Sequence, residues 1–170
     1  MRALVTVGST GFDDLIRSVI DGKVLSTLYE LGYDHLTIQY GSSKAIYNDR
    51  LERISTTSNR TPVIEGYNYK PDLKCDMVES DLIISHAGSG SILESLRLHK
   101  QLIVVVNEKL LDNHQDELAC ALENKGYLLR STCRQLSDVL NALKNKYFIP
   151  FPEQDTSIFA SFLNNEMGFK

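Results

Sequence analysis

Asp81-Leu-Ile-Ile-Ser-His-Ala-Gly-Ser-Gly-Ser91 decides the fold, because a short apolar run passes directly into a loop of glycine and serine. The run that ends at Ile84 has the length of a buried strand of a parallel sheet. Ile92, Leu93 and Leu96 then follow at the spacing of a helix with one apolar face. The segment predicts a strand, a loop and a helix in succession, which is the repeating unit of an α/β domain.

The rest of the chain alternates in the same way between β-rich runs and helical spacing. Further strands are predicted at Arg2–Val7, His35–Tyr40, Thr61–Gly66, Gln101–Val106 and Tyr127–Leu129. Helices are predicted from Phe12 onward and less regularly past Gly22 to Leu31, then at Asp72–Glu79, Gln115–Lys125 and Leu136–Leu143. Residues 42–60 are expected to form a loop with at most one short helix. This alternation predicts a doubly wound, Rossmann-like parallel sheet over residues 1–148.

A tail over residues 149–170 follows this domain, and Pro150 and Pro152 end the regular pattern. Its apolar stripe consists of Ile158, Phe159, Phe162 and Leu163. The stripe predicts one last short helix over 156–163, which either packs on its own domain or docks a partner.

The glycine and serine loop is a candidate anion site. Its residues can turn N–H groups and hydroxyls toward the positive end of a helix dipole: Ser85, His86, Ala87, Gly88, Ser89, Gly90 and Ser91. The formal net charge of −4 supplies no basic patch, so a diphosphate here is expected to be held by amides. Glu94 accepts hydrogen bonds from ribose hydroxyls, forms a capping box with Ser91 as N-cap, or does both.

Two other loops carry candidate residues. Gly8, Ser9 and Thr10 follow the first strand, where a small-residue loop is either a tight turn or a place of close ligand approach. Asp112, Asn113, His114 and Gln115 offer mixed donors and acceptors that suit sugar hydroxyls, or simply cap a helix in a solvated loop. His86 and His114 are candidate general bases, against the alternative of structural or hydrogen-bonding histidines.

Composition excludes several functional classes. The acidic balance gives no electrostatic reason to expect nucleic-acid binding, and no apolar run reaches the length needed to span a bilayer. Cys75, Cys120 and Cys133 have neither the spacing of metal ligands nor that of a disulfide framework, which indicates a reducing compartment.

Three segments, taken in order, resemble the C-terminal, donor-binding half of GT-B glycosyltransferases of the family 28 type. They are Val5 to Asp13, Ile84 to Glu94 and Asp112 to Gln115, and the His-Ala-Gly-Ser-Gly-Ser segment with its following Glu is the specific part. The likeness covers residues 2 to 145. Within this family the chain looks like the branch of eukaryotic two-subunit transferases that act on dolichol-linked GlcNAc.

The resemblance implies a role for each matching position. UDP-N-acetylglucosamine would be the donor substrate, and no metal or other cofactor would be needed. Gly88 to Ser91 would hold the diphosphate, and Glu94 would bind the ribose. Asn113, His114 and Gln115 would contact the sugar, and Gly8 to Thr10 would border the cleft opposite.

The acceptor-binding half of such an enzyme is missing from the sequence. The resemblance therefore implies a heterodimer with a membrane-anchored subunit that binds the dolichol-linked acceptor. It also implies a cytoplasmic chain recruited to the cytosolic face of the endoplasmic reticulum, with no direct membrane insertion. Two alternatives remain open at the level of sequence. They are a self-sufficient UDP-sugar enzyme of the epimerase kind and a non-catalytic nucleotide-binding module with a flavodoxin-like fold.

Overall fold

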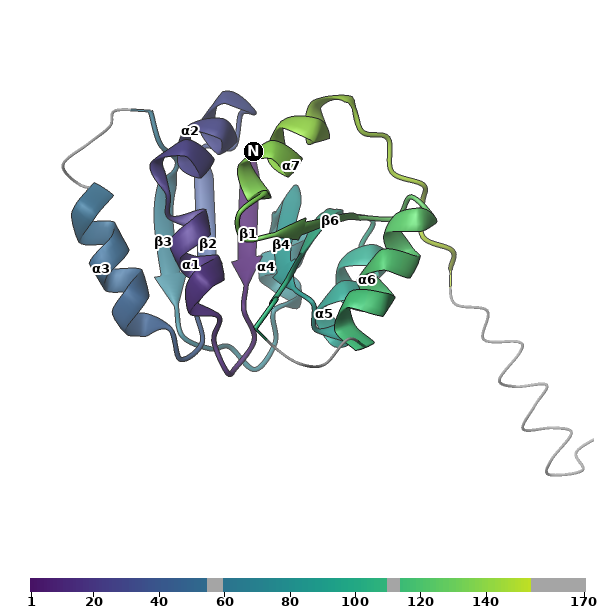
Figure 1. The fold of residues 1–170 in the computed structure, drawn as a ribbon, viewed down its shortest axis with the longest axis horizontal. Helices are drawn as coiled ribbons and strands as arrows, with labels where there is room; N and C mark the ends of the chain where they lie inside the picture. Colours follow the sequence, from purple (N-terminus) through teal and green to yellow (C-terminus); the bar gives the residue numbers. More distant parts are fainter. Residues whose placement is uncertain (55–59, 110–113, 154–170) are drawn as a thin grey trace, which may run out of the picture.

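The computed structural model describes residues 1–54, 60–109 and 114–153. Its centre is a six-stranded parallel sheet in the order β3-β2-β1-β4-β5-β6, as the doubly wound prediction requires (Figure 1). The strands are β1 (Arg2–Thr6), β2 (His35–Gln39), β3 (Val63–Tyr67), β4 (Leu82–His86), β5 (Gln101–Val106) and β6 (Leu129–Thr132). The order reverses between β1 and β4, which lie side by side and start the two halves of the sheet.

Helices cover both faces of the sheet. They are α1 (Asp13–Val19), α2 (Gly22–Glu30), α3 (Lys44–Ile54), α4 (Lys74–Glu79), α5 (Ser89–Arg97), α6 (His114–Asn124) and α7 (Leu136–Ala142), which continues into the 3-10 turn η1 (Leu143–Asn145). Side chains alternate between two cores because successive strand residues point to opposite faces. Val5 and Ile84 join the core under α1, α2, α3 and α7, whereas Leu4 and Ile83 join the core under α4, α5 and α6.

Several local boundaries differ from the predictions, and two of the differences have a physical reason in the structure. The helical pattern from Phe12 to Leu31 is two helices, because Asp21 accepts a hydrogen bond from the Lys23 N–H at 3.0 Å and caps a new helix. The expected loop over 42–60 contains an eleven-residue helix, α3, whose only fully buried side chain is Tyr47, so its apolar periodicity is weak. The last strand begins two residues later than predicted.

Only the first part of the predicted tail lies among the described residues. Residues 149–153 follow the domain and contact it. Phe151 packs edge-on against Tyr127 of the domain, with ring centroids 5.2 Å apart. The helix predicted over 156–163 lies outside the described residues. In the described part of the chain, no helix is both long and apolar enough to cross a bilayer.

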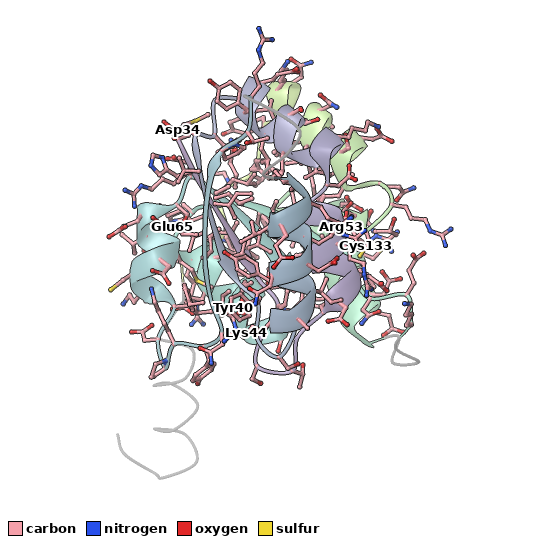
Figure 2. All side chains as sticks on the ribbon, turned by 90° about the vertical axis from the view of Figure 1, so that its left-hand side faces the viewer. Asp34, Tyr40, Lys44, Arg53, Glu65 and Cys133 are labelled. Carbon is pink, nitrogen blue, oxygen red and sulfur yellow. The ribbon has the colours of Figure 1, made fainter. Side chains whose placement is uncertain are left out.

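All strands run in the same direction, so their carboxyl ends gather at one edge of the sheet, the lower edge in Figure 1. Figure 2 shows this for β2: Asp34, before the strand, lies near the top, and Tyr40, after it, lies near the bottom. Thr6 of β1 pairs in register with Gln39 of β2 and with Ser85 of β4. The loops that follow these three strands therefore meet at the carboxyl edge.

One glycine in β3 is set by packing and gives a test of the fold. A Cβ at Gly66 would lie 2.5 Å from Cζ of Tyr47, whose ring stacks on Tyr40 with a centroid distance of 4.6 Å. We expect Gly66→Ala to displace this ring and to lower the free energy of unfolding by about 1–3 kcal/mol in urea denaturation. Gly22→Ala is the matched control, since nothing lies within 4 Å of its added Cβ. Equal stabilities of the two variants would contradict this packing.

Candidate functional site

The imidazole of His86, the last residue of β4, lies between two glycine-containing loops. Its Nδ1 is 3.2 Å from the carbonyl oxygen of Thr6. A carbonyl can only accept, so Nδ1 carries the proton of this hydrogen bond and Nε2 holds the lone pair of the neutral ring. A Cβ added at Gly8 would lie 2.9 Å from Nε2, and one added at Gly88 only 2.5 Å. Both positions therefore require glycine while the ring stays in place.

Burial determines the protonation of this histidine. Removal of the ring from water lowers the pKa of His86 from its ordinary value of 6.5, and this effect outweighs the hydrogen bond to Thr6, which raises it. His86 is therefore neutral at physiological pH, with its unprotonated Nε2 directed at the gap between Gly8 and Gly88.

Helix α5 starts directly beside this ring. Gly88 is its N-cap with an extended backbone (φ −73°, ψ 122°), and the first intrahelical bond runs from the Ile92 N–H to the Gly88 carbonyl at 3.1 Å. An α-helix leaves its first N–H groups without intrahelical acceptors, here those of Ser89, Gly90 and Ser91. Ser89 and Gly90 are exposed. The start of α5 thus presents amides and a positive dipole end to solvent, which suits an anion.

The capping box expected for this helix is wrong. The helix begins at Ser89, so Ser91 is its third residue and not the N-cap, and Glu94 is its sixth residue. The Ser91 carbonyl accepts a hydrogen bond from the Ser95 hydroxyl at 2.7 Å, inside the helix. Gly88 allows the early start, since it brings the backbone past His86 where any side chain would collide. The partly buried Glu94 thus remains available for a ligand one turn beyond the loop.

The structure separates supporting residues from exposed ones. Ser85 and Ala87 are buried, and the Ser85 hydroxyl donates to the His86 carbonyl at 2.7 Å. These two residues therefore support the loop and do not face solvent. Ser9 and Thr10 are exposed between Gly8 (φ 74°) and Gly11 (φ 80°), which adopt backbone conformations that favour glycine. The Gly8 loop and the start of α5 therefore face the same opening, on two sides of His86.

The predicted sugar-binding loop cannot be compared in the same way. Asp112 and Asn113 lie outside the described residues. His114 and Gln115 form the first two positions of α6, and their side chains also lie outside the described part. Helix α6 follows β5, so its start belongs to the same carboxyl edge as His86.

Two buried polar residues below the Gly8 loop were not found from the sequence. Thr6 and Gln39 are at most 1% exposed, and the Thr6 hydroxyl donates to Gln39 Oε1 at 2.7 Å. The sequence did carry one signal for Gln39: it is a polar residue at the carboxyl end of a strand whose other buried residues are apolar.

A separate cavity lies elsewhere in the described part of the structure. It has a volume of about 490 Å³ and lies between α1 and the segment that leads into α7. Phe12, Arg17, Arg50, Lys109 and Cys133 are among its lining residues, and no residue of the Gly8 loop or of residues 85–94 is.

Among the described residues there is no group of three or more His, Cys, Asp or Glu side chains placed to hold a metal ion.

Comparison with known proteins places the chain in a family. The model of the glycosyltransferase family 28 C-terminal domain matches residues 2–158. The UDP-N-acetylglucosamine transferase subunit ALG13 of Yarrowia lipolytica is 36% identical over 175 residues, covering 99% of this chain and 86% of the relative. The mouse protein of the same name is 46% identical over 136 residues. That match covers 80% of this chain but only 11% of the mouse protein, so the chain spans about a tenth of it.

Solved structures agree on the fold. The NMR solution structure of ALG13 superposes with a TM-score of 0.74 at 28% identity, covering 95% of this chain and 94% of that one. MurG of Acinetobacter baumannii superposes with a TM-score of 0.61 at 19% identity, covering 85% of this chain and 41% of that one. A putative UDP-N-acetylglucosamine 2-epimerase from Listeria monocytogenes gives 0.56 at 15% identity, covering 99% of this chain and 46% of that one. The last two likenesses concern the fold alone.

The protonation of His86 can be tested directly. We expect its pKa in the folded chain to lie below 6.5, as followed by NMR titration of the ring protons. The unfolded chain then takes up the proton first, so stability is constant above about pH 6.5 and falls as the pH drops toward the folded-state pKa. His86→Gln should lose this part of the pH dependence of unfolding. A His86 pKa at or above 6.5 would contradict the buried, neutral ring.

Proposed function

The chain belongs to the glycosyltransferase family 28 C-terminal domain family, and from this premise we propose that it is the donor-binding subunit of an N-acetylglucosaminyltransferase. We propose UDP-N-acetylglucosamine as the donor, because the relatives from mouse and Yarrowia lipolytica are named as UDP-N-acetylglucosamine transferase subunits. The acceptor is dolichyl-diphosphate-GlcNAc, and the product is a β-1,4 linkage in the synthesis of lipid-linked oligosaccharide for N-glycosylation.

One observation carries this proposal: the start of α5 presents free amides beside His86 and opposite the Gly8 loop. A diphosphate placed there would accept hydrogen bonds from the N–H groups of Ser89, Gly90 and Ser91. A helix start of this kind can bind a dianion without lysines. Glu94 would accept hydrogen bonds from the ribose, and Asn113, His114 and Gln115 would contact the sugar.

The reaction follows from this placement. An acceptor hydroxyl of dolichyl-diphosphate-GlcNAc attacks the anomeric carbon, the new glycosidic bond forms with inversion, and the bond to the UDP oxygen breaks. Negative charge grows on the leaving diphosphate, and the amides of α5 stabilise it in place, an electrostatic contribution to the rate. The proposal assigns no metal or other cofactor to this step.

His86 and His114 are the two candidates for accepting the proton of the acceptor hydroxyl. The Thr6 carbonyl holds the Nδ1 proton of His86, so Nε2 is the basic atom and faces the gap between the loops. A lowered pKa keeps it unprotonated at neutral pH, as a base must be. A base from the partner subunit is the alternative.

A GT-B active site lies between two domains, and residues 2–158 match the model of the C-terminal one. We infer a heterodimer with a membrane-anchored subunit, which binds the acceptor and recruits this chain to the cytosolic face of the endoplasmic reticulum. The word subunit in the names of the relatives supports a complex.

A substitution at Gly88 tests the proposed mechanism most directly. We expect Gly88→Asp to lower transfer by the assembled complex at least about 100-fold, because its carboxylate displaces His86 and repels the diphosphate. Gly22→Asp, at the start of α2, is the matched control, since it adds the same carboxylate outside the site, where an added Cβ meets nothing within 4 Å. Circular dichroism should show that both variants are folded. Wild-type transfer by folded Gly88→Asp would remove the loop from the mechanism.

The function itself is tested by isolating the complex. We expect the tagged full chain to co-purify with a membrane protein, and the pulled-down complex to transfer GlcNAc from UDP-GlcNAc to a lipid-linked acceptor. The chain alone should turn over little donor. Turnover of UDP-GlcNAc by the purified chain alone would favour a self-sufficient UDP-sugar enzyme. Equal binding of unrelated nucleotides would favour a non-catalytic module.

A further inference from the structure

Gln39, the last residue of β2, makes four hydrogen bonds from one buried carboxamide. Its Oε1 accepts from the Thr6 hydroxyl at 2.7 Å and from the Gly8 N–H at 3.1 Å. Its Nε2 donates to the carbonyl oxygens of Gly8 and Asn68, each at 2.9 Å. The side chain is 1% exposed, so no water replaces these partners.

We propose that Gln39 is the positioning residue of the donor site, fixing the Gly8 loop and, through Thr6, the ring of His86. This inference rests on the proposed function. Both backbone groups of Gly8 are bound by the same carboxamide, so the peptide planes on either side of Gly8 are fixed together. Glycine at φ 74° has the backbone freedom that makes such a restraint necessary.

The link to His86 runs through Thr6. The Thr6 hydroxyl is held by Gln39, and the Thr6 carbonyl accepts the Nδ1 proton of His86 at 3.2 Å. Gln39 therefore acts on both sides of the gap into which Nε2 points, without reaching the ligand itself.

The loop after β3 is tied into the same arrangement. The Asn68 carbonyl accepts from Gln39 Nε2 and from the Gly41 N–H, both at 2.9 Å. A Cβ at Gly41 would lie 2.4 Å from the Gly8 carbonyl oxygen, so the loops after β1 and β2 are in direct contact. One carboxamide thus sets the spacing of the loops after β1 and β3.

Only an amide fits this position. Two of its bonds need an acceptor and two need a donor. A glutamate of the same shape would keep the acceptor but would turn a charged oxygen toward two carbonyl oxygens. A methionine would keep most of the volume and lose all four bonds.

The test compares Gln39→Glu and Gln39→Met with Gln101→Glu as control. Gln101 lies at the opposite end of the sheet, and its Oε1 accepts from the Tyr33 hydroxyl at 3.1 Å, a bond that a carboxylate keeps. In the assembled transferase we expect the KM for UDP-GlcNAc to rise at least about tenfold in both Gln39 variants, and kcat to fall as well where His86 is the base. The control should resemble wild type in both constants.

A second measurement on the isolated full chain does not depend on activity. Amide hydrogen exchange at Gly8, followed by NMR, should be at least about tenfold faster in Gln39→Met than in wild type, while the interior of β4 stays protected. If Gln39→Met folds with wild-type exchange at Gly8, the positioning role is wrong. If exchange rises but the KM does not, Gln39 orders the loop without serving the donor, which also overturns the proposal. Failure of wild type to bind UDP-GlcNAc would instead contradict the proposed function.

Discussion

The candidate site depends on one close approach, in which the His86 ring fills the space that side chains at positions 8 and 88 would occupy. The pairing of β1 with β4 brings the loops that carry both glycines close to Nε2 of this ring. Because Gly88 lets the backbone pass the ring, α5 can begin at Ser89 and direct its free amides outward. The neutral state of the histidine and the anion-binding character of the helix start both follow from this arrangement.

Much of the fold could be read from local sequence. The strand, loop and helix around Ser85 to Ser91 were predicted because apolar runs and glycine pairs act over short distances. The parallel, doubly wound order also followed, since alternating strands and helices permit few other topologies. The length of α3 was underestimated because Tyr47 is its one buried residue, so its sequence shows no strong apolar face.

The site was predicted as a set of segments but not as a geometry. Ser91 was placed at the N-cap because a serine followed by a glutamate is a common local signal, yet the collision at Gly88 fixes the helix start three residues earlier. Gln39 lies 31 residues from Gly8 in the chain and contacts it only after β1 and β2 pair. Such a role depends on three-dimensional contacts, which no local pattern records.

The most direct test is to map UDP-GlcNAc onto the labelled full chain by NMR. The account predicts that the largest shifts of backbone amide resonances occur at Ser89, Gly90 and Ser91, followed by Gly8. Largest shifts at Arg17, Arg50 and Cys133, around the cavity beside α1, would contradict it.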